Sequence, residues 1–208
     1  MLLYIASLDS FGQEEYEKYY ALADETRRRD IDRKRIENDK RRSLLGDALA
    51  RRGISELLCI DERDIIFART ENGKPYCENA EVFFSVSHSK ERVVCAVGFC
   101  GLGVDTEKIR YTEPRVMRAC CIDGDFEYIL GGEGESESLT DSQLKRFFCL
   151  WTAKEAYCKH IGVGVTGMKS ISLSQIIDNC RFFENGEYIT AVYSADVDFE
   201  IEIRDASI

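Results

Sequence analysis

The sequence predicts an α+β protein made of two similar α/β lobes related by pseudo-twofold symmetry, with a functional site in the cleft between them. Helical and strand-like segments alternate along 208 residues, a length that suffices for one large domain or two small ones. In addition, LLGDALARRGI…FARTENGKPY resembles LWTAKEAYCKHIG…FFENGEYI, each a helix, a strand and the turn Glu-Asn-Gly. We therefore expect an N-terminal lobe over residues 1–100 and a C-terminal lobe over 101–208. The site is expected between them, because binding sites commonly lie in crevices between such halves.

The first half begins with a short apolar strand, Met1–Ser7, and Ser10 is the expected cap of a helix that reaches Ala23. Residues 24–52 are predicted to be helical, with Gly53 as the stop signal. Asn72-Gly73 predicts a turn. The other elements expected here are a short helix at Ile54–Ile60 and strands at Ile65–Ala68, Glu81–Ser87 and Val93–Phe99, the last two joined by a bend at His88-Ser89-Lys90.

The second half is predicted to centre on an amphipathic helix, Phe147–Gly164, that ends at a glycine pair. Thr140 and Gln143 before it have the spacing of a capping box. The acidic, glycine-rich residues 131–138 predict a mobile loop that gates the site or contacts a partner. The remaining elements expected are a helix at Glu113–Leu130 and strands at Leu102–Ile109, Met168–Leu173, Arg181–Phe183, Tyr188–Ser194 and Asp198–Ile203.

Composition indicates a globular protein of the cytoplasm. The chain is 44% hydrophobic and 32% charged, without an apolar run long enough to span a membrane, and its N-terminus lacks the basic start of a signal peptide. Nine cysteines, an odd number without a CxxC pair, and two histidines argue against a disulfide framework and a zinc site. We interpret most of these cysteines as reduced core thiols.

Charge disfavours nucleic acid as a partner, because the net charge is −10. The charge is uneven: residues 24–52 carry eleven Lys and Arg against seven Asp and Glu. Such a basic segment could bind a compact polyanion, although a solvated helix with mixed charge pairs is the commoner case.

The helix around residue 155 carries polar residues that a wholly structural helix rarely places beside large apolar ones. At about 100° per residue, Phe148, Glu155 and Lys159 share one face. Lys154, the residue before Glu155, lies about 100° round the helix from it. The alternative is an ordinary surface ion pair between Glu155 and Lys159, worth a few tenths of a kcal/mol.

The strand Gly103-Val-Asp-Thr-Glu-Lys-Ile109 carries the second informative pattern. Residues two apart on a strand point the same way, so Asp105 and Glu107 project their carboxylates together. Oxygen ligands without a neighbouring His or Cys suit Mg²⁺ rather than Zn²⁺, and Mg²⁺ takes further ligands from a phosphate. The alternative is an exposed edge strand, unless a third carboxylate, with Glu155 the natural candidate, joins the pair.

Gly73-Lys74-Pro75 and the segment from Phe84 to Ser89 offer groups suited to an anion. Two hydroxyls, an imidazole and backbone N–H groups would be available at the expected bend. His88 lacks a clear Ser/Asp or Cys partner for a nucleophilic triad, and a lone His at a strand end is more often structural.

Taken together, the ordered motifs GKP, FSVSHS, GVDTE and WTAKEAYCK resemble those of the surfactin-type 4′-phosphopantetheinyl transferases. The segment RRSLLGDALAR at 41–51 also resembles that family, and the likeness runs from about residue 27 to 167. The resemblance implies a two-lobed monomer of duplicated halves. It also implies Mg²⁺-dependent transfer of 4′-phosphopantetheine from coenzyme A to a serine of an acyl or peptidyl carrier protein, with release of 3′,5′-ADP.

The resemblance also implies roles for single residues. Asp105, Glu107 and Glu155 would hold Mg²⁺ against the coenzyme A diphosphate, and Glu155 would be the base that takes the serine proton. Lys154 and Lys159 would neutralise the phosphates, and Lys159 would assist the leaving group. The groups implied to hold the 3′-phosphate, the adenine and the diphosphate are Arg42, Lys74, Ser87 and His88, with Arg27 added where the family shows a basic pair.

Two features depart from the family pattern: three arginines crowd positions 27–29, and Ser85 stands where an Asn is common. Two other functions stay open. One is a Mg²⁺-dependent phosphohydrolase of coenzyme A or a nucleotide, which needs no carrier protein. The other is a non-catalytic module that binds coenzyme A or a carrier, against which the intact carboxylate and lysine set speaks.

Overall fold

The computed structural model describes residues 1–122, 124–132, 134 and 139–206, and it confirms the α+β class. The chain forms two compact units. The first comprises Met1–Phe99 together with the C-terminal segment from Glu200, and the second is Cys100–Phe199. The expected C-terminal lobe, residues 101–208, included the last segment, whereas this division places that segment in the first unit. That segment belongs to the first unit because its strand pairs with the N-terminal one.

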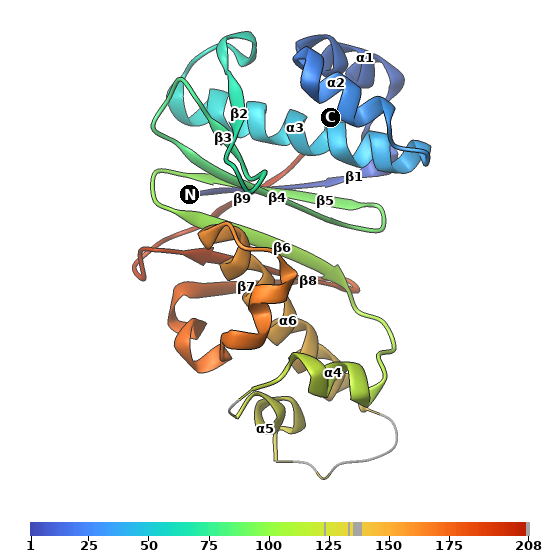
Figure 1. The fold of residues 1–208 in the computed structure, drawn as a ribbon, viewed down its shortest axis with the longest axis vertical. Helices are drawn as coiled ribbons and strands as arrows, with labels where there is room; N and C mark the ends of the chain where they lie inside the picture. Colours follow the sequence, from blue (N-terminus) through green and yellow to red (C-terminus); the bar gives the residue numbers. More distant parts are fainter. Residues whose placement is uncertain (123, 133, 135–138, 207–208) are drawn as a thin grey trace. The chain divides into compact units, whose positions relative to one another are not determined.

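The first unit packs helix α3 on a four-stranded sheet of order β4-β5-β1-β9, and helices α1 and α2 pack on α3. Figure 1 shows the red C-terminal strand β9 beside the blue N-terminal strand β1, and these two run parallel. The strands are β1 (Leu2–Ser7), β4 (Phe83–Ser89), β5 (Arg92–Gly98) and β9 (Glu202–Asp205), with a separate hairpin of β2 (Phe67–Arg69) and β3 (Pro75–Cys77). The helices are α1 (Gln13–Leu22), α2 (Glu25–Asp32) and α3 (Glu37–Leu58).

Helix α3 is longer than predicted, because Gly53 does not end it. A Cβ at Gly53 would lie 2.6 Å from Val97 Cγ2, so the glycine lets the helix approach β5 closely. The helix ends at Cys59, whose φ is 54°. The single helix predicted over 24–52 is broken at residues 33–36, and the predicted cap Ser10 lies instead in the 3-10 helix Leu8–Ser10, with Gly12 preceding α1.

The second unit consists of a three-stranded antiparallel sheet of order β6-β8-β7 and the long helix α6 packed on it. The strands are β6 (Leu102–Lys108), β7 (Cys180–Asn185) and β8 (Tyr188–Ser194). The helices are α4 (Pro114–Cys120), α5 (Asp125–Leu130) and α6 (Asp141–Ile161), and the 3-10 helices are η3 (Val165–Ser170), η4 (Leu173–Gln175) and η5 (Ile177–Asn179).

The capping box before α6 is confirmed, because Thr140 and Gln143 make both hydrogen bonds and Gly162 ends the helix at φ 75°. The strand predicted at Met168–Leu173 is wrong: η3 and η4 lie there, and Ser172 and Gln175 form a capping box that favours the turn. The helix predicted at Glu113–Leu130 is two short helices, α4 and α5. Positions 133 and 135–138 of the acidic loop lie outside the described residues.

The two units share one connectivity. In each, a strand is followed by a long helix and then by a hairpin whose second strand pairs antiparallel with the first strand: β1, α3, β4, β5 and β6, α6, β7, β8. The Glu-Asn-Gly turns do not correspond, however. The turn ending at Gly73 joins β2 to β3, whereas the one ending at Gly186 joins β7 to β8. The internal similarity therefore lies in the strand, helix and hairpin order and not in the tripeptide. The tripeptide recurs only because each hairpin needs a glycine in the left-handed conformation.

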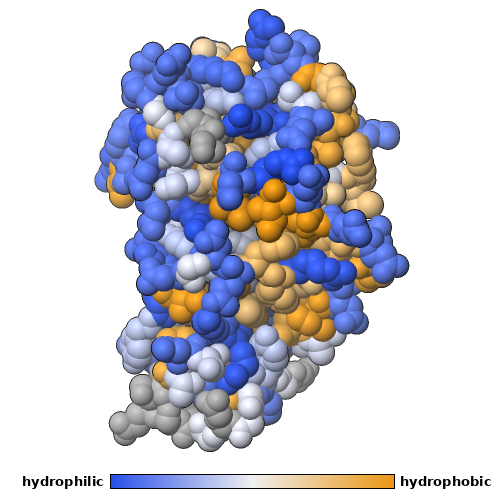
Figure 2. Space-filling model, turned by 180° about the vertical axis from the view of Figure 1, so that it is seen from behind, coloured by the Kyte–Doolittle hydropathy of each residue, from blue (hydrophilic) through white to orange (hydrophobic). Residues whose placement is uncertain are grey.

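The surface seen in Figure 2 is mainly hydrophilic with separate apolar patches, as 32% charged residues would give. All nine cysteines are free thiols, four of them buried. Among the described residues, no helix is both long and apolar enough to cross a membrane.

Candidate active site

Strand β6 directs Asp105 and Glu107 toward helix α6. Gly103 shows the direction, because a Cβ there would point at the carbonyl of Ala156 in α6, and residues two apart on a strand share a face. Asp105 is 3% exposed, which is unusual for a carboxylate unless it is paired. The predicted alternation of the strand thus aims both carboxylates at the helix that carries Glu155.

Helix α6 provides the cation that pairs with Asp105. Lys159 Nζ lies 2.8 Å from Asp105 Oδ1, so this lysine bonds across to β6. Glu155 lies one turn before Lys159 on α6, and the charges of Asp105 and Lys159 both affect its pKa. Burial and the neighbouring Asp105 raise the pKa of Glu155 from 4.5 to about 7, while Lys159 acts to lower it and Glu107 to raise it further. Asp105 and Glu107 therefore lie close enough to Glu155 to influence its charge.

Glu107 is held by Arg110, a residue that sequence analysis did not single out. Arg110 Nη1 donates to Glu107 Oε2 at 2.7 Å, and its guanidinium lies 5.4 Å from the centre of the Phe148 ring. Phe148 lies two turns before Glu155 on α6, so Arg110 covers the same face of the helix. Glu107 and Arg110 lie three residues apart across the end of β6. No sequence pattern indicated that they would pair.

These residues suit Mg²⁺ by their chemistry, although their side chains are not arranged as a metal site. In the described part of the chain, no three Asp, Glu, His or Cys side chains are grouped so that they could hold a metal ion. Asp105 and Glu107 are instead turned to the cations Lys159 and Arg110. Oxygen donors and an excess of negative charge fit a hard divalent cation, provided that the two carboxylates turn from their present cations.

Lys154 does not lie with this group. Its side chain is fully buried and Nζ lies 2.5 Å from Asp125 Oδ2 and 2.9 Å from the carbonyl of Cys120. Asp125 also accepts the backbone N–H groups of Ile122 and Leu173. The role predicted for Lys154 at a phosphate is therefore corrected: Lys154 joins α6 to the α4–α5 segment and η4. Asp125 is the partner that sequence analysis missed, because it lies 29 positions away in the chain.

In the first unit, Ser87 and His88 lie within strand β4 and not in a bend. The chain reverses at Lys90, whose φ is 55°, because β4 pairs with β5 from Phe83 to Ser89. Ser87 is buried and His88 is exposed, as alternation along a strand requires. The predicted bend at His88-Ser89-Lys90 therefore holds only at Lys90, because β4 continues through Ser89.

Arg42 reaches the same turn from α3. Its Nε donates to the carbonyl of Lys90, and Nη1 pairs with Asp39 Oδ1 at 2.5 Å. A cavity of about 410 Å³ lies at this point. It is lined by Leu8, Asp9, Asn38, Arg41, Arg42, Lys90 and Glu91. Arginine, lysine and an asparagine around one hollow can bind an anionic group by charge and hydrogen bonds.

Lys74 lines a second, more apolar cavity of about 540 Å³ with Pro75, Phe83, Phe84 and Phe99. Burial lowers the pKa of Lys74. Arg27 lines a third cavity, of about 290 Å³, where it pairs with Asp47 at 2.6 Å and donates to Ser43 at 2.9 Å. Arg27 thus has acidic and hydroxyl partners within its own unit.

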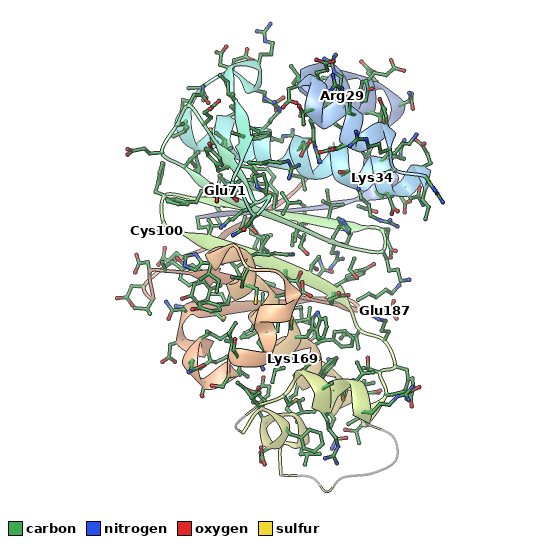
Figure 3. The ribbon with its side chains drawn as sticks, viewed as in Figure 1. Arg29, Lys34, Glu71, Cys100, Lys169 and Glu187 are labelled. Atoms are coloured by element: carbon green, nitrogen blue, oxygen red, sulfur yellow. The ribbon has the colours of Figure 1, made fainter. Side chains whose placement is uncertain are left out.

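Part of the basic segment 24–52 makes ion pairs with its own acids, which is the commoner case weighed above. Arg29 pairs with Glu25, Lys40 with Glu37 and Arg42 with Asp39. Figure 3 shows Arg29 at the outer side of α2, where its pair is open to solvent. Exposed pairs of this kind contribute little to stability, about 0–1 kcal/mol each.

Family models match both units. One described as the N-terminal part of 4′-phosphopantetheinyl transferase covers residues 12–99, and one described as the 4′-phosphopantetheinyl transferase superfamily covers residues 101–202. The chain is 34% identical over 127 residues to the 4′-phosphopantetheinyl transferase gsp of Aneurinibacillus migulanus, covering 61% of this chain and 51% of that protein. It is 30% identical over 156 residues to the 4′-phosphopantetheinyl transferase Sfp of Bacillus subtilis, covering 74% and 67%.

The chain therefore belongs to the surfactin-type 4′-phosphopantetheinyl transferase family, as its motifs predicted. It spans about half the length of the gsp protein.

Proposed function

We propose that this protein transfers 4′-phosphopantetheine from coenzyme A to a serine of an acyl or peptidyl carrier protein. The observation that carries the proposal is the meeting of Asp105 and Glu107 of β6 with Glu155 and Lys159 of α6, within a chain of this family. Phosphoryl-type transfer needs positioning and charge neutralisation more than covalent help from the protein, and this group of side chains offers both.

In the proposed reaction, the serine hydroxyl oxygen of the carrier attacks the phosphorus that bears the pantetheine arm. A bond from serine oxygen to phosphorus forms, and the bond from that phosphorus to the oxygen of 3′,5′-ADP breaks. Glu155 accepts the serine proton at a carboxylate oxygen and so acts as the general base. Lys159 neutralises the developing charge on the leaving phosphate.

Asp105, Glu107 and Glu155 are the residues that would hold Mg²⁺. When bound, the ion would neutralise the diphosphate and polarise its oxygens. Arg42, Lys74, Ser87 and His88 of the first unit are proposed to hold the 3′-phosphate, the adenine and the diphosphate. Arg27 stays a weaker candidate because Asp47 and Ser43 already occupy its guanidinium. That the two units enclose the site as pseudo-twofold halves is part of this proposal.

The carrier protein and the setting are also proposed. The free thiols fit the reducing cytoplasm, and the family resemblance implies a monomer that binds neither nucleic acid nor membrane. Light scattering of the purified protein tests the monomer directly, since a mass of twice 23.8 kDa would exclude it.

Intact mass spectrometry of an apo carrier protein tests the proposed function. The carrier is incubated with coenzyme A, Mg²⁺ and this protein, with Glu155→Gln and an EDTA-treated sample as controls. We expect the carrier to gain one phosphopantetheine group, and both controls to leave it unchanged. Consumption of coenzyme A without any gain on several carriers would identify a phosphohydrolase instead. Intact coenzyme A and unmodified carriers would indicate a binding module.

A further inference from the structure

Lys159 is the cation that Asp105 holds in this structure. The two atoms are 2.8 Å apart, and the Asp105 side chain is 4% exposed against 30% for Lys159. The carboxylate is therefore fixed and buried, whereas the ammonium sits at the end of a flexible stem that reaches solvent. Lys159 also lies in the last turn of α6, three residues before Gly162 ends the helix. The lysine can thus turn away while Asp105 stays in place.

Lys159 lies among several carboxyl groups. Glu155 feels Asp105 and Glu107 as negative neighbours and Lys159 as a positive one. Arg110 is paired to Glu107 at 2.7 Å. Lys159 and Arg110 thus each place a single positive charge beside these carboxyl groups, and the carboxyl groups offer only oxygen donors.

We propose that Lys159 is an internal substitute for the divalent cation, so that metal and ammonium compete for Asp105. An ammonium and a divalent ion on one carboxylate repel each other strongly at this short distance, because buried charges are little screened. Metal binding therefore requires Lys159 to leave, and the displaced ammonium needs a new anionic partner. The coenzyme A diphosphate supplies one, which rests on the proposed function above.

This competition couples metal to substrate. Without coenzyme A, the metal must displace Lys159 into water, so it binds weakly. With coenzyme A, the diphosphate accepts both the metal and Lys159, so each ligand strengthens the binding of the other. Asp105 is meanwhile kept paired and in position when the site holds no metal.

Mn²⁺ binding to the full chain tests the proposal without any turnover. Free Mn²⁺ is measured by electron paramagnetic resonance, with and without coenzyme A and with no carrier protein present. The variants are Lys159→Gln, which removes the competing charge, and Lys159→Arg, which keeps it. Lys145→Gln is the matched control, because Lys145 lies on the same helix and pairs with the exposed Glu184.

We expect Lys159→Gln to bind Mn²⁺ alone roughly tenfold more tightly than the unmodified protein, and to gain less affinity on adding coenzyme A. Lys159→Arg and Lys145→Gln should bind Mn²⁺ like the unmodified protein. Equal or weaker binding by Lys159→Gln, while coenzyme A still promotes Mn²⁺ binding, would overturn the competition and leave the proposed function standing. An equal gain in Lys145→Gln would overturn it as a general charge effect. Absence of Mn²⁺ binding in every sample, with coenzyme A present, would reject the metal role and the competition together.

Discussion

Gly103 sets the distance between the strand that carries Asp105 and the helix that carries Glu155. A Cβ at this position would lie 1.9 Å from the carbonyl oxygen of Ala156 and 2.8 Å from the backbone nitrogen of His160. Both neighbours are backbone atoms of α6, so rotation of a side chain cannot relieve the clash. Gly103→Ala therefore forces β6 and α6 apart by about 1 Å, the shortfall from the 3.0 Å that real Cβ contacts respect.

The expected cost follows from that displacement. Overpacking of a core contact costs about 1–3 kcal/mol. For a unit of this size each kcal/mol lowers the melting temperature by roughly 4–8 °C. A misplacement of about 1 Å between reacting groups can also lower the rate roughly 100-fold. Thermal unfolding followed by circular dichroism and the initial rate of carrier modification measure the two effects.

Gly164→Ala is the matched control for Gly103→Ala. A Cβ at Gly164 meets nothing within 4 Å, and its φ of −72° suits any residue. The control should therefore keep the melting temperature and the rate. If Gly103→Ala melts within 2 °C of the unmodified protein, on the order of the assay error, and keeps its rate, the close approach of β6 to α6 is not what positions the site.

Three further outcomes are expected. Lys154→Met should cost about 3–5 kcal/mol in the free energy of unfolding, because it leaves Asp125 buried and unpaired. Its calorimetric affinity for coenzyme A should change less than threefold, roughly, and a selective loss of that affinity at normal stability would return Lys154 to the phosphates. In EDTA, the stability contributed by Glu155 is fully present below its unfolded pKa of 4.5. This contribution is lost as pH rises through the folded pKa of about 7, so the melting temperature should fall over this range. Glu155→Gln should remove that slope, and an unchanged slope would contradict the assignment. A hydrogen bond from the Tyr4 hydroxyl and, to a smaller extent, the Arg204 guanidinium lower the pKa of Glu56. The stability that Glu56 contributes is therefore present above pH 4.5 and is lost as pH falls through the folded pKa. Urea midpoints of Glu56→Gln should therefore lose part of the acid sensitivity, and equal midpoint profiles would refute it.

Local patterns predicted the parts of the site that depend on one element. The period of two in β6 placed Asp105 and Glu107 on one face, and the spacing of Thr140 and Gln143 predicted where α6 begins. Both features depend only on neighbouring residues. The structure keeps them for that reason.

Features that depend on distant partners escaped prediction. Lys154 lies about 140° round the helix from Lys159, so the two side chains leave the helix in different directions. The burial of Lys154 depends on its pairing with Asp125, which comes from a different segment. Arg110 was missed although it lies only three positions after Glu107, because the pair forms where the chain leaves β6. Gly53 looked like a stop because glycine usually ends helices, whereas here it allows α3 to approach Val97.

The C-terminal strand shows the same limit at the scale of the fold. Residues 202–205 pair in parallel with Leu2–Ile5, and no local pattern indicates which unit a terminal strand joins. Backbone hydrogen bonds between residues far apart in the chain form this pairing, and Arg204 of the strand also pairs with Glu56. Sequence periodicity therefore predicts the strand but not its partner.

Anomalous diffraction from crystals grown with Mn²⁺ and coenzyme A tests the central claim most directly. The account predicts one manganese peak bonded by Asp105, Glu107 and Glu155, with Lys159 moved from Asp105 to the diphosphate. A manganese peak held by other residues, or a diphosphate bound while Lys159 still pairs with Asp105, would contradict it.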